Sequence, residues 1–156
     1  MKTVETVETK TYYDWLSDIA KTDGGFTVLT TLINKDSKVP ESNVKAALAR
    51  TKEVLRKRIE EGRPYFCACE HTQSYFGREG FNKAYDHAST AEQILGGWLD
   101  EEKIYFDSVH NYFTLNAAQE AADQNKQLEF CQFELKPDGK LIVVFWKKKD
   151  GKWVRT

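Results

Sequence analysis

The chain lacks the features of membrane-bound and secreted proteins. Its 156 residues contain no apolar run of about 18 residues, the length that a membrane-spanning helix needs. No signal-like apolar segment follows Met1. Cysteine is also scarce, and three residues are an odd number for a disulfide framework. These absences predict a cytoplasmic protein with reduced thiols and without a membrane among its partners.

The chain also lacks an excess of either charge. It has 23 Lys and Arg against 24 Asp and Glu, which gives a formal net charge of −1. A general nucleic-acid binder normally has a basic excess, so this balance argues against that class, and it gives equally little support for an acidic mimic of DNA. With 40% hydrophobic and 30% charged residues, we expect an ordinary folded protein. The length suits one domain over residues 1–156.

Motifs that bind nucleotide cofactors are missing. Gly24-Gly25 precedes a predicted strand rather than a helix, so it forms neither a P-loop nor a dinucleotide fingerprint. We therefore expect no cofactor, and we favour a protein without enzymatic activity.

One cluster has residues of the types that bind metal. In Cys67-Ala68-Cys69-Glu70-His71, alternate residues of a predicted strand point to one face, and Cys131 could complete a zinc site. A flat strand spreads these side chains too evenly for tetrahedral coordination, and no second paired motif is present. We favour buried core cysteines and no metal, with Cys67, Cys69, His71 and Cys131 as the alternative.

Groups for acid, base or nucleophilic chemistry are isolated. Asp107 lies in the middle of an apolar predicted strand, where we expect it to accept hydrogen bonds at a buried edge; a general acid or base is the alternative. A cysteine nucleophile would need Cys69 or Cys131 beside a histidine, and no local motif selects a pair. The histidines are His71, His87 and His110.

Hydrophobic periodicity predicts an α+β fold. Apolar residues at helical spacing begin a helix at Tyr12, and Gly24 suits the left-handed position that ends it. A second stripe predicts a helix from Glu41 to Glu61. Asp-Gly dipeptides predict two hairpin turns near the C-terminus, and Asn116 is predicted to cap a helix. Further elements are expected at 26–33, 64–71, 81–89, 96–99, 103–113, 128–135, 141–146 and 152–154. We predict an antiparallel sheet of about five or six strands with two or three helices packed against it.

A set of short motifs resembles small domains of phages and other mobile elements. These are Gly24-Gly25-Phe26-Thr27, Gly96-Gly97-Trp98, Tyr105-Phe106-Asp107, the alanines between 117 and 122, and Asn125 with Gln127. The resembling family consists of uncharacterised accessory domains without established catalytic residues. It implies a phage or mobile-element protein in a bacterial cytoplasm that binds and inhibits or modulates a host protein, such as an antiviral-defence component. We expect residues 96–127 to be scaffold, with glycines for a turn, and the functional surface to lie elsewhere.

Exposed aromatics and the mixed-charge helix are the predicted contact surface for that partner. Aromatic residues make up 13% of the chain, which suits either a core or a binding surface. The predicted contacts are Arg56, Arg58, Tyr75, Arg78 and Trp153.

The alternative function is binding of nucleic acid or nucleotide by the C-terminal hairpin. Lys147, Lys148, Lys149 and Lys152 lie beside Trp153, as cations and aromatics do in proteins that bind single strands. Lysines that protect a sheet edge from pairing give the same pattern. The oligomeric state is not predicted.

Overall fold

A computed structural model describes residues 7–62, 65–69, 75–89 and 94–156, with only the backbone of 65–69, Tyr75 and Val109. The elements are β1 (Thr9–Thr11), α1 (Tyr12–Asp23), β2 (Gly25–Leu29), a 3-10 helix η1 (Thr30–Leu32), β3 (Lys38–Pro40), α2 (Glu41–Glu60), β4 (Tyr65–Cys69), β5 (Tyr75–Phe76), α3 (Gly77–Ala88), β6 (Ile94–Asp100), β7 (Lys103–Tyr112), α4 (Leu115–Gln124), β8 (Glu129–Leu135), β9 (Leu141–Lys149) and β10 (Lys152–Arg155).

One large antiparallel sheet organises the fold. Its eight strands follow the order β10-β9-β8-β4-β7-β6-β2, and β5 pairs with β7 beside this path. The short strands β1 and β3 form a separate pair. The predicted α+β class with an antiparallel sheet is confirmed. The sheet has more strands than predicted, because all the long predicted strands join it together with the two-residue β5.

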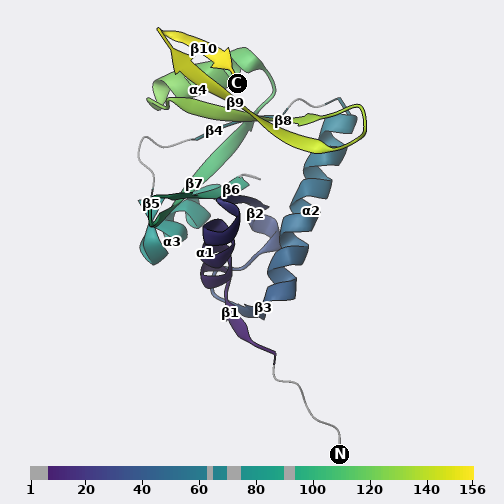
Figure 1. Ribbon diagram of the computed structural model, residues 1–156, viewed down its shortest axis with the longest axis vertical. Helices are drawn as coiled ribbons and strands as arrows, with labels where there is room; N and C mark the ends of the chain where they lie inside the picture. The colour runs from purple at the N-terminus through teal and green to yellow at the C-terminus, as the bar shows by residue number, and fades with distance from the viewer. Residues whose placement is uncertain (1–6, 63–64, 70–74, 90–93) are drawn as a thin grey trace, which may run out of the picture.

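The sheet has two halves (Figure 1). Strand β4 joins them, because it pairs with β7 of the first half and with β8 of the second. The first, β2–β6–β7, packs one face on α1 and α3; the fully buried side chains there are Leu16, Val28, Phe81, Leu95 and Phe106. The second, β8–β9–β10, packs one face on α4. The small residues Ala118 and Ala122 let that helix approach Phe130 closely, as the alanine pattern predicted.

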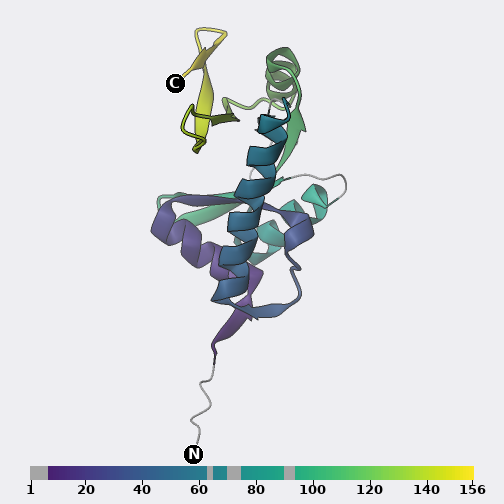
Figure 2. The ribbon, with the colours of Figure 1, turned by 90° about the vertical axis from the view of Figure 1, so that its right-hand side faces the viewer.

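Helix α2 connects the two halves. Leu55 on its C-terminal part packs with Leu29 and Ile94 of the first half and with Phe133 of the second. Figure 2 shows α2 rising past the first half toward the second. The predicted stripe of this helix is confirmed, and it includes the fully buried Thr51, whose hydroxyl accepts the N–H of Leu29 at 3.0 Å.

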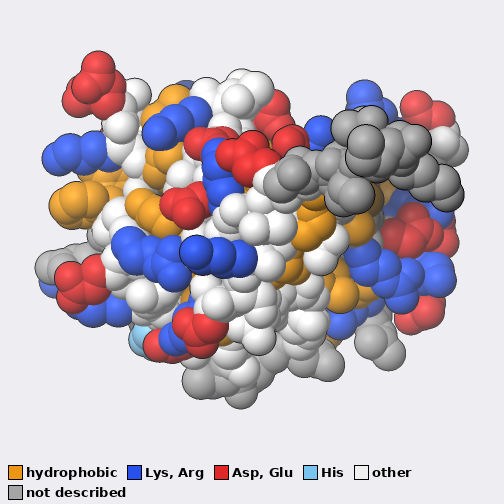
Figure 3. Space-filling model, turned by 90° about the horizontal axis from the view of Figure 1, so that it is seen from below, with side chains coloured by type: hydrophobic (Ala, Val, Ile, Leu, Met, Phe, Trp, Pro, Cys, Tyr) orange, Lys and Arg blue, Asp and Glu red, His pale blue; other side chains and the backbone are white. Residues whose placement is uncertain are grey.

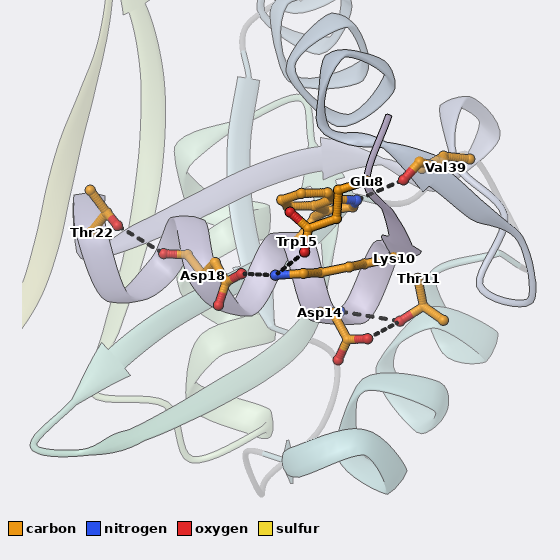
Figure 4. A network of polar contacts seen from close by, with 8 residues as sticks. All are labelled: Glu8, Lys10, Thr11, Asp14, Trp15, Asp18, Thr22 and Val39. Carbon is orange, nitrogen blue, oxygen red and sulfur yellow. Dashed lines mark hydrogen bonds and ion pairs between the residues drawn. The ribbon is translucent and has the colours of Figure 1, made fainter. Parts of the chain in front are cut away.

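Polar contacts fix the N-terminal part of α1 (Figure 4). The Thr11 hydroxyl caps the first turn by accepting the N–H of Asp14 at 3.3 Å. Trp15 Nε1 donates to the Val39 carbonyl at 2.7 Å, which ties α1 to β3. At the other end Gly24 has φ of 88°, the left-handed conformation that the sequence predicted.

Three local predictions are wrong. Helix α4 is capped by Thr114, whose hydroxyl accepts the N–H of Ala117 at 3.1 Å, so Asn116 lies inside the first turn. The strand predicted over 26–33 ends at Leu29, where η1 turns the chain. The turn expected from Gly96 and Gly97 is wrong because both lie inside β6, whereas the strands predicted at 96–99 and 103–113 are confirmed, with the turn between them at 101–102, where Glu101 has φ of 55°.

Candidate functional site

A cleft of about 810 Å³ lies between the two halves of the main sheet. Strands β2 and β6 form one wall, and β8 and β9 form the other, with the 126–128 segment at the mouth. In Figure 2 the C-terminal strands, in yellow, stand above the β2–β6 half. Its volume is in the range of small-molecule pockets, and its open side also admits a segment of polypeptide.

The first wall contains a row of three small or short residues. Thr27 pairs with Gly96, and Gly96 pairs with Asp107, so these three residues share the cleft face of neighbouring strands. A Cβ atom placed on Gly96 would approach nothing closer than the Asp107 carbonyl oxygen at 3.9 Å. The missing side chain of Gly96 therefore adds room to the cleft.

Gly97 has a different role on the opposite face. A Cβ atom placed there would lie 2.2 Å from a carbon of the Phe26 ring. Phe26 packs against the first hydrophobic cluster, so Gly97 makes room for core packing. Both glycines line the cleft, and the missing side chain makes room for core packing at Gly97 and for the cleft at Gly96.

Asp107 places a carboxylate in this wall. Asp107 is only 7% exposed and lines the cleft. The predicted burial is confirmed. Asp107 pairs with Gly96 of β6 and lies between the stretches of β7 that pair with β5, at 105–106, and with β4, at 109–112.

The second wall is apolar. Cys131 pairs with Phe145 and Phe133 pairs with Val143 across β8 and β9, and all four line the cleft. Val143 is 45% and Phe145 43% exposed. Leu128 at the mouth is 77% exposed. Because fully burying a side chain of this size is worth about 1.5–3 kcal/mol, this wall favours an occupant with apolar groups.

Charged side chains at the mouth of the cleft are more exposed than Asp107. Glu129 lies 3.9 Å from Lys147 Nζ, which balances its charge, and Lys126 is exposed beside it. Asp107 is thus the charged residue of the buried lining. Elsewhere charges alternate: Figure 3 shows basic and acidic side chains interspersed over the lower end of the molecule.

The predicted partner contacts do not line the cleft. Arg56 pairs with Glu53 at 2.9 Å and Glu60 at 3.8 Å on α2, and Arg58 lies on the same helix. Arg78 on α3 donates to the Thr11 hydroxyl at 3.0 Å. The Tyr75 side chain lies outside the described residues.

The basic hairpin is partly neutralised. Lys147 lies near Glu129, and Lys148 forms an ion pair with Asp123. Trp153 packs edge-on against Phe130, with ring centroids 5.0 Å apart, and is partly buried under α4. Lys149 and Lys152 pair across the hairpin and are exposed.

The cysteine cluster is described only in part. The backbone of β4 pairs Cys67 with Cys131 of β8. The side chains of Cys67 and Cys69, and all of His71, lie outside the described residues. Cys131 is a free thiol in the cleft wall. Within the part that is described, no group of three or more His, Cys, Asp or Glu is placed to hold a metal ion.

Part of the motif set that resembles phage and mobile-element domains lies along the cleft, whereas Tyr105, Phe106, Asn125 and the alanines between 117 and 122 do not line it. Gly24–Thr27, Gly96–Trp98, Asp107 and Gln127 all line it. The sequence prediction treated residues 96–127 as scaffold and missed this site. A usable signal was present, since glycine inside a strand often marks a place where a ligand or another chain approaches closely.

Comparison of the chain with protein-family models, with curated proteins and with solved structures gives no match. Among the helices that the structure describes, none combines the length and the apolar character needed to cross a membrane.

Proposed function

We propose that this protein binds a segment of a partner protein in the cleft and carries out no chemistry of its own. The observation that carries the proposal is the uncovered apolar wall of β8 and β9, with Val143 and Phe145 nearly half exposed. Water-exposed apolar side chains that converge on a cavity are typical of interaction sites.

The lining of the cleft suits binding better than catalysis. Its buried carboxylate, Asp107, and its thiol, Cys131, lie on opposite walls. The other residues of the second wall are aliphatic or aromatic and supply contact area. The apolar lining therefore favours recognition of an apolar partner over acid–base chemistry.

The resemblance to phage and mobile-element domains implies that the protein acts in a bacterial cell. The partner is then a protein of the bacterial host, and binding inhibits or modulates it. An antiviral-defence component is one such target, as the family resemblance implies.

A capture experiment with paired variants tests this function. The protein is immobilised and exposed to bacterial lysate, and retained proteins are identified and then titrated in purified form. Gly96→Val places an isopropyl group in the cleft, and we expect it to weaken binding by about tenfold or more, since a wall side chain that keeps one anchor of the partner out of place costs more than about 1.4 kcal/mol. A retained partner that binds Gly96→Val as tightly as the original protein would contradict the proposal.

The second candidate function is nucleic-acid binding by the hairpin. The exposed cross-strand pair Lys149 and Lys152 favours it. The double variant Lys149→Glu/Lys152→Glu serves as the matched control because both residues lie outside the cleft. Loss of capture in this variant, with strong salt dependence and without an effect of Gly96→Val, would support the nucleic-acid function.

A further inference from the structure

Beside the cleft, the face of β5, β6 and β7 opposite α1 and α3 carries a row of three aromatic side chains. This aromatic row consists of Trp98 of β6, Tyr105 of β7 and Phe76 of β5. We propose that it is a second binding site, which takes a proline-rich segment in the polyproline II conformation with a Lys or Arg at one end. The aromatic row is separate from the apolar wall of β8 and β9, so this inference goes beyond the proposed function.

The register of the sheet brings the three rings together. Trp98 pairs with Tyr105, and Tyr105 pairs with Phe76. The Trp98 and Tyr105 rings are stacked with their centroids 5.8 Å apart, and the Phe76 ring meets the Tyr105 ring edge-on at 6.1 Å. Because alternate side chains of a strand share a face, the aromatic row lies on the same face as the neighbouring pair Gly96 and Asp107.

The aromatic row is accessible because the helices pack on the other face. Ile104 and Phe106, which flank Tyr105 in β7, pack in the first hydrophobic cluster with residues of α1 and α3. In Figure 1 both helices lie below β5 and β6. Phe76 is 58% exposed, and Trp98 and Tyr105 are partly exposed. Exposed aromatic side chains that gather on one face are typical of an interaction site.

Two of the rings carry a hydrogen-bond donor that is free to meet a ligand. Among the described residues, neither Trp98 Nε1 nor the Tyr105 hydroxyl has a hydrogen-bond partner. Tryptophan and tyrosine thus offer an apolar ring with a polar tip, a combination that is common at interfaces. The carbonyl groups of a proline-rich segment can accept from both donors, because polyproline II has no internal hydrogen bonds.

The strands beneath the aromatic row favour a ligand that does not add to the sheet. At Trp98, β6 is paired with both β2 and β7, and at Tyr105, β7 is paired with both β6 and β5. A segment that crosses these strands therefore binds through the rings and the two donors, and its own backbone stays in water. Polyproline II suits this mode because it is preformed and its backbone is solvated, and aromatic-lined grooves are the surfaces on which it docks.

The turn between β6 and β7 supplies the charge that selects the ligand. Asp100, Glu101 and Glu102 are exposed, and none of their carboxylates forms an ion pair within the described part of the chain. Asp100 lies two residues beyond the aromatic row in β6, a distance of about 7 Å along the strand. Lys103 is also exposed, and its Nζ lies 5.2 Å from the centroid of the Phe76 ring.

Three carboxylates and one ammonium group leave this turn negative. A cation of the ligand is attracted there, whereas the phosphates of a nucleic acid are repelled. Aromatic rows on sheets also bind the bases of single-stranded nucleic acids. The charge beside this row therefore favours a peptide with a Lys or Arg next to its prolines.

The test measures fluorescence polarisation of labelled probes with the full chain. The proline probe is a peptide of about four polyproline II turns, with proline at every third position and arginine at one end. One comparison peptide has alanine in place of each proline, and a second has glutamate in place of arginine. An oligothymidylate of the same length is the nucleic-acid probe.

Four variants locate the binding on the aromatic row. Phe113→Ala is the matched control for Phe76→Ala, because Phe113 is 63% exposed and lies outside the row. Circular dichroism checks that each variant is folded. The variants are Phe76→Ala, Tyr105→Phe, Phe113→Ala and the triple variant Asp100→Asn/Glu101→Gln/Glu102→Gln.

We expect the proline probe to bind with a Kd below about 1 mM and about tenfold or more tightly than the alanine peptide. Phe76→Ala weakens it by about fivefold or more, and Tyr105→Phe, which keeps the ring, by about threefold. The original protein prefers arginine to glutamate by about threefold or more, and the triple variant loses this preference. Phe113→Ala binds as the original protein does.

Equal binding of the proline and alanine peptides, an unchanged affinity in Phe76→Ala, or no binding of the proline probe up to about 1 mM would overturn this inference. Binding of oligothymidylate alone, with loss in Phe76→Ala, would assign the row to nucleobases and also overturn it. Gly96→Val is expected to leave the proline probe bound. The captured host partner and its dependence on Gly96 decide the proposed function separately.

Discussion

The two halves of the main sheet differ in how their faces are covered. In the β2–β6–β7 half, large apolar side chains such as Leu95 and Phe106 point to α1 and α3, and the cleft face carries the short row Thr27–Gly96–Asp107. In the β8–β9–β10 half, residues 141–146 of β9 are apolar on both faces. Helix α4 covers only the face of Trp146, which leaves Val143 and Phe145 partly exposed.

This difference separates residues that stabilise the fold from residues available to a partner. In the first half, Leu95 and Phe106 are fully enclosed by the chain itself. Val143 and Phe145 on β9 stay partly in contact with water, so under the proposed function their further burial would contribute to binding rather than to folding. The predictions below test that division.

The largest difference in unfolding free energy is expected when one phenylalanine side chain in each half is truncated to alanine. Phe106→Ala removes a fully buried ring from the first cluster, and we expect it to cost about 3–5 kcal/mol of unfolding free energy. Phe145→Ala removes a ring that is 43% exposed, and we expect a cost below about 1.5 kcal/mol together with loss of partner capture. Urea denaturation measures both. Similar costs for the two variants would show that the β9 face is enclosed in solution.

The glycine pair gives the next effect. Gly97→Val forces a side chain into the Phe26 ring, and we expect it to cost about 1–3 kcal/mol. Gly96→Val enters open space in the cleft, and valine favours strands, so we expect its stability to change by less than about 1 kcal/mol. Thermal and urea denaturation of the two variants compare the two faces of one strand. A greater loss for Gly96→Val would contradict the assignment of that face to the cleft.

The cap of α4 tests the covered face of the second half. Thr114→Ala removes the hydroxyl that accepts the Ala117 N–H, and we expect a loss of about 1 kcal/mol. Asn116→Ala is the control, with a change within about 0.5 kcal/mol, because Asn116 lies past the cap. The midpoint of urea denaturation measures both. A greater loss of stability for Asn116→Ala than for Thr114→Ala would show that Asn116 caps the helix, as the sequence predicted.

The smallest effect concerns the charged surface of α2, which joins the halves. The hydrogen bond from Arg56 lowers the pKa of Glu53 below its ordinary value of 4.5. A carboxyl with a lowered pKa in the folded state stabilises the fold above its ordinary pKa, and this contribution is lost as the pH falls through the folded-state pKa. We expect Glu53→Gln to be slightly less stable than the original protein at pH 7 and equally stable near pH 2. Urea denaturation across that range checks the sign, and an equal difference at both ends would contradict it.

The prediction of individual elements from sequence succeeded where the responsible forces are local. The stripe of α2, the left-handed Gly24 and the C-terminal hairpins follow from spacing within a few residues. The helix start at Thr114 was missed because Thr114 and Asn116 are both good caps, and the backbone conformation decides between them. The end of β2 was missed because β-branched residues continue past Leu29 into η1.

The site was predicted less well than the fold. The motif glycines were assigned to scaffold, and Asp107 was expected to accept hydrogen bonds, with a general acid or base as the alternative. The predicted contacts Arg56, Arg78 and Trp153 instead have partners within the chain. Sequence patterns show that a side chain is charged or aromatic, and they do not show which neighbour it meets.

The sequence by itself determined the α+β class, the longer helices and strands, and the hairpin turns, because periodicity and turn chemistry act over short distances along the chain. Only the tertiary structure decided that Thr27, Gly96 and Asp107 form one row, and that this row lies across a cleft from Val143 and Phe145. The physical reason is that strand order and helix packing determine which faces stay uncovered. Those choices depend on contacts between residues far apart in the sequence.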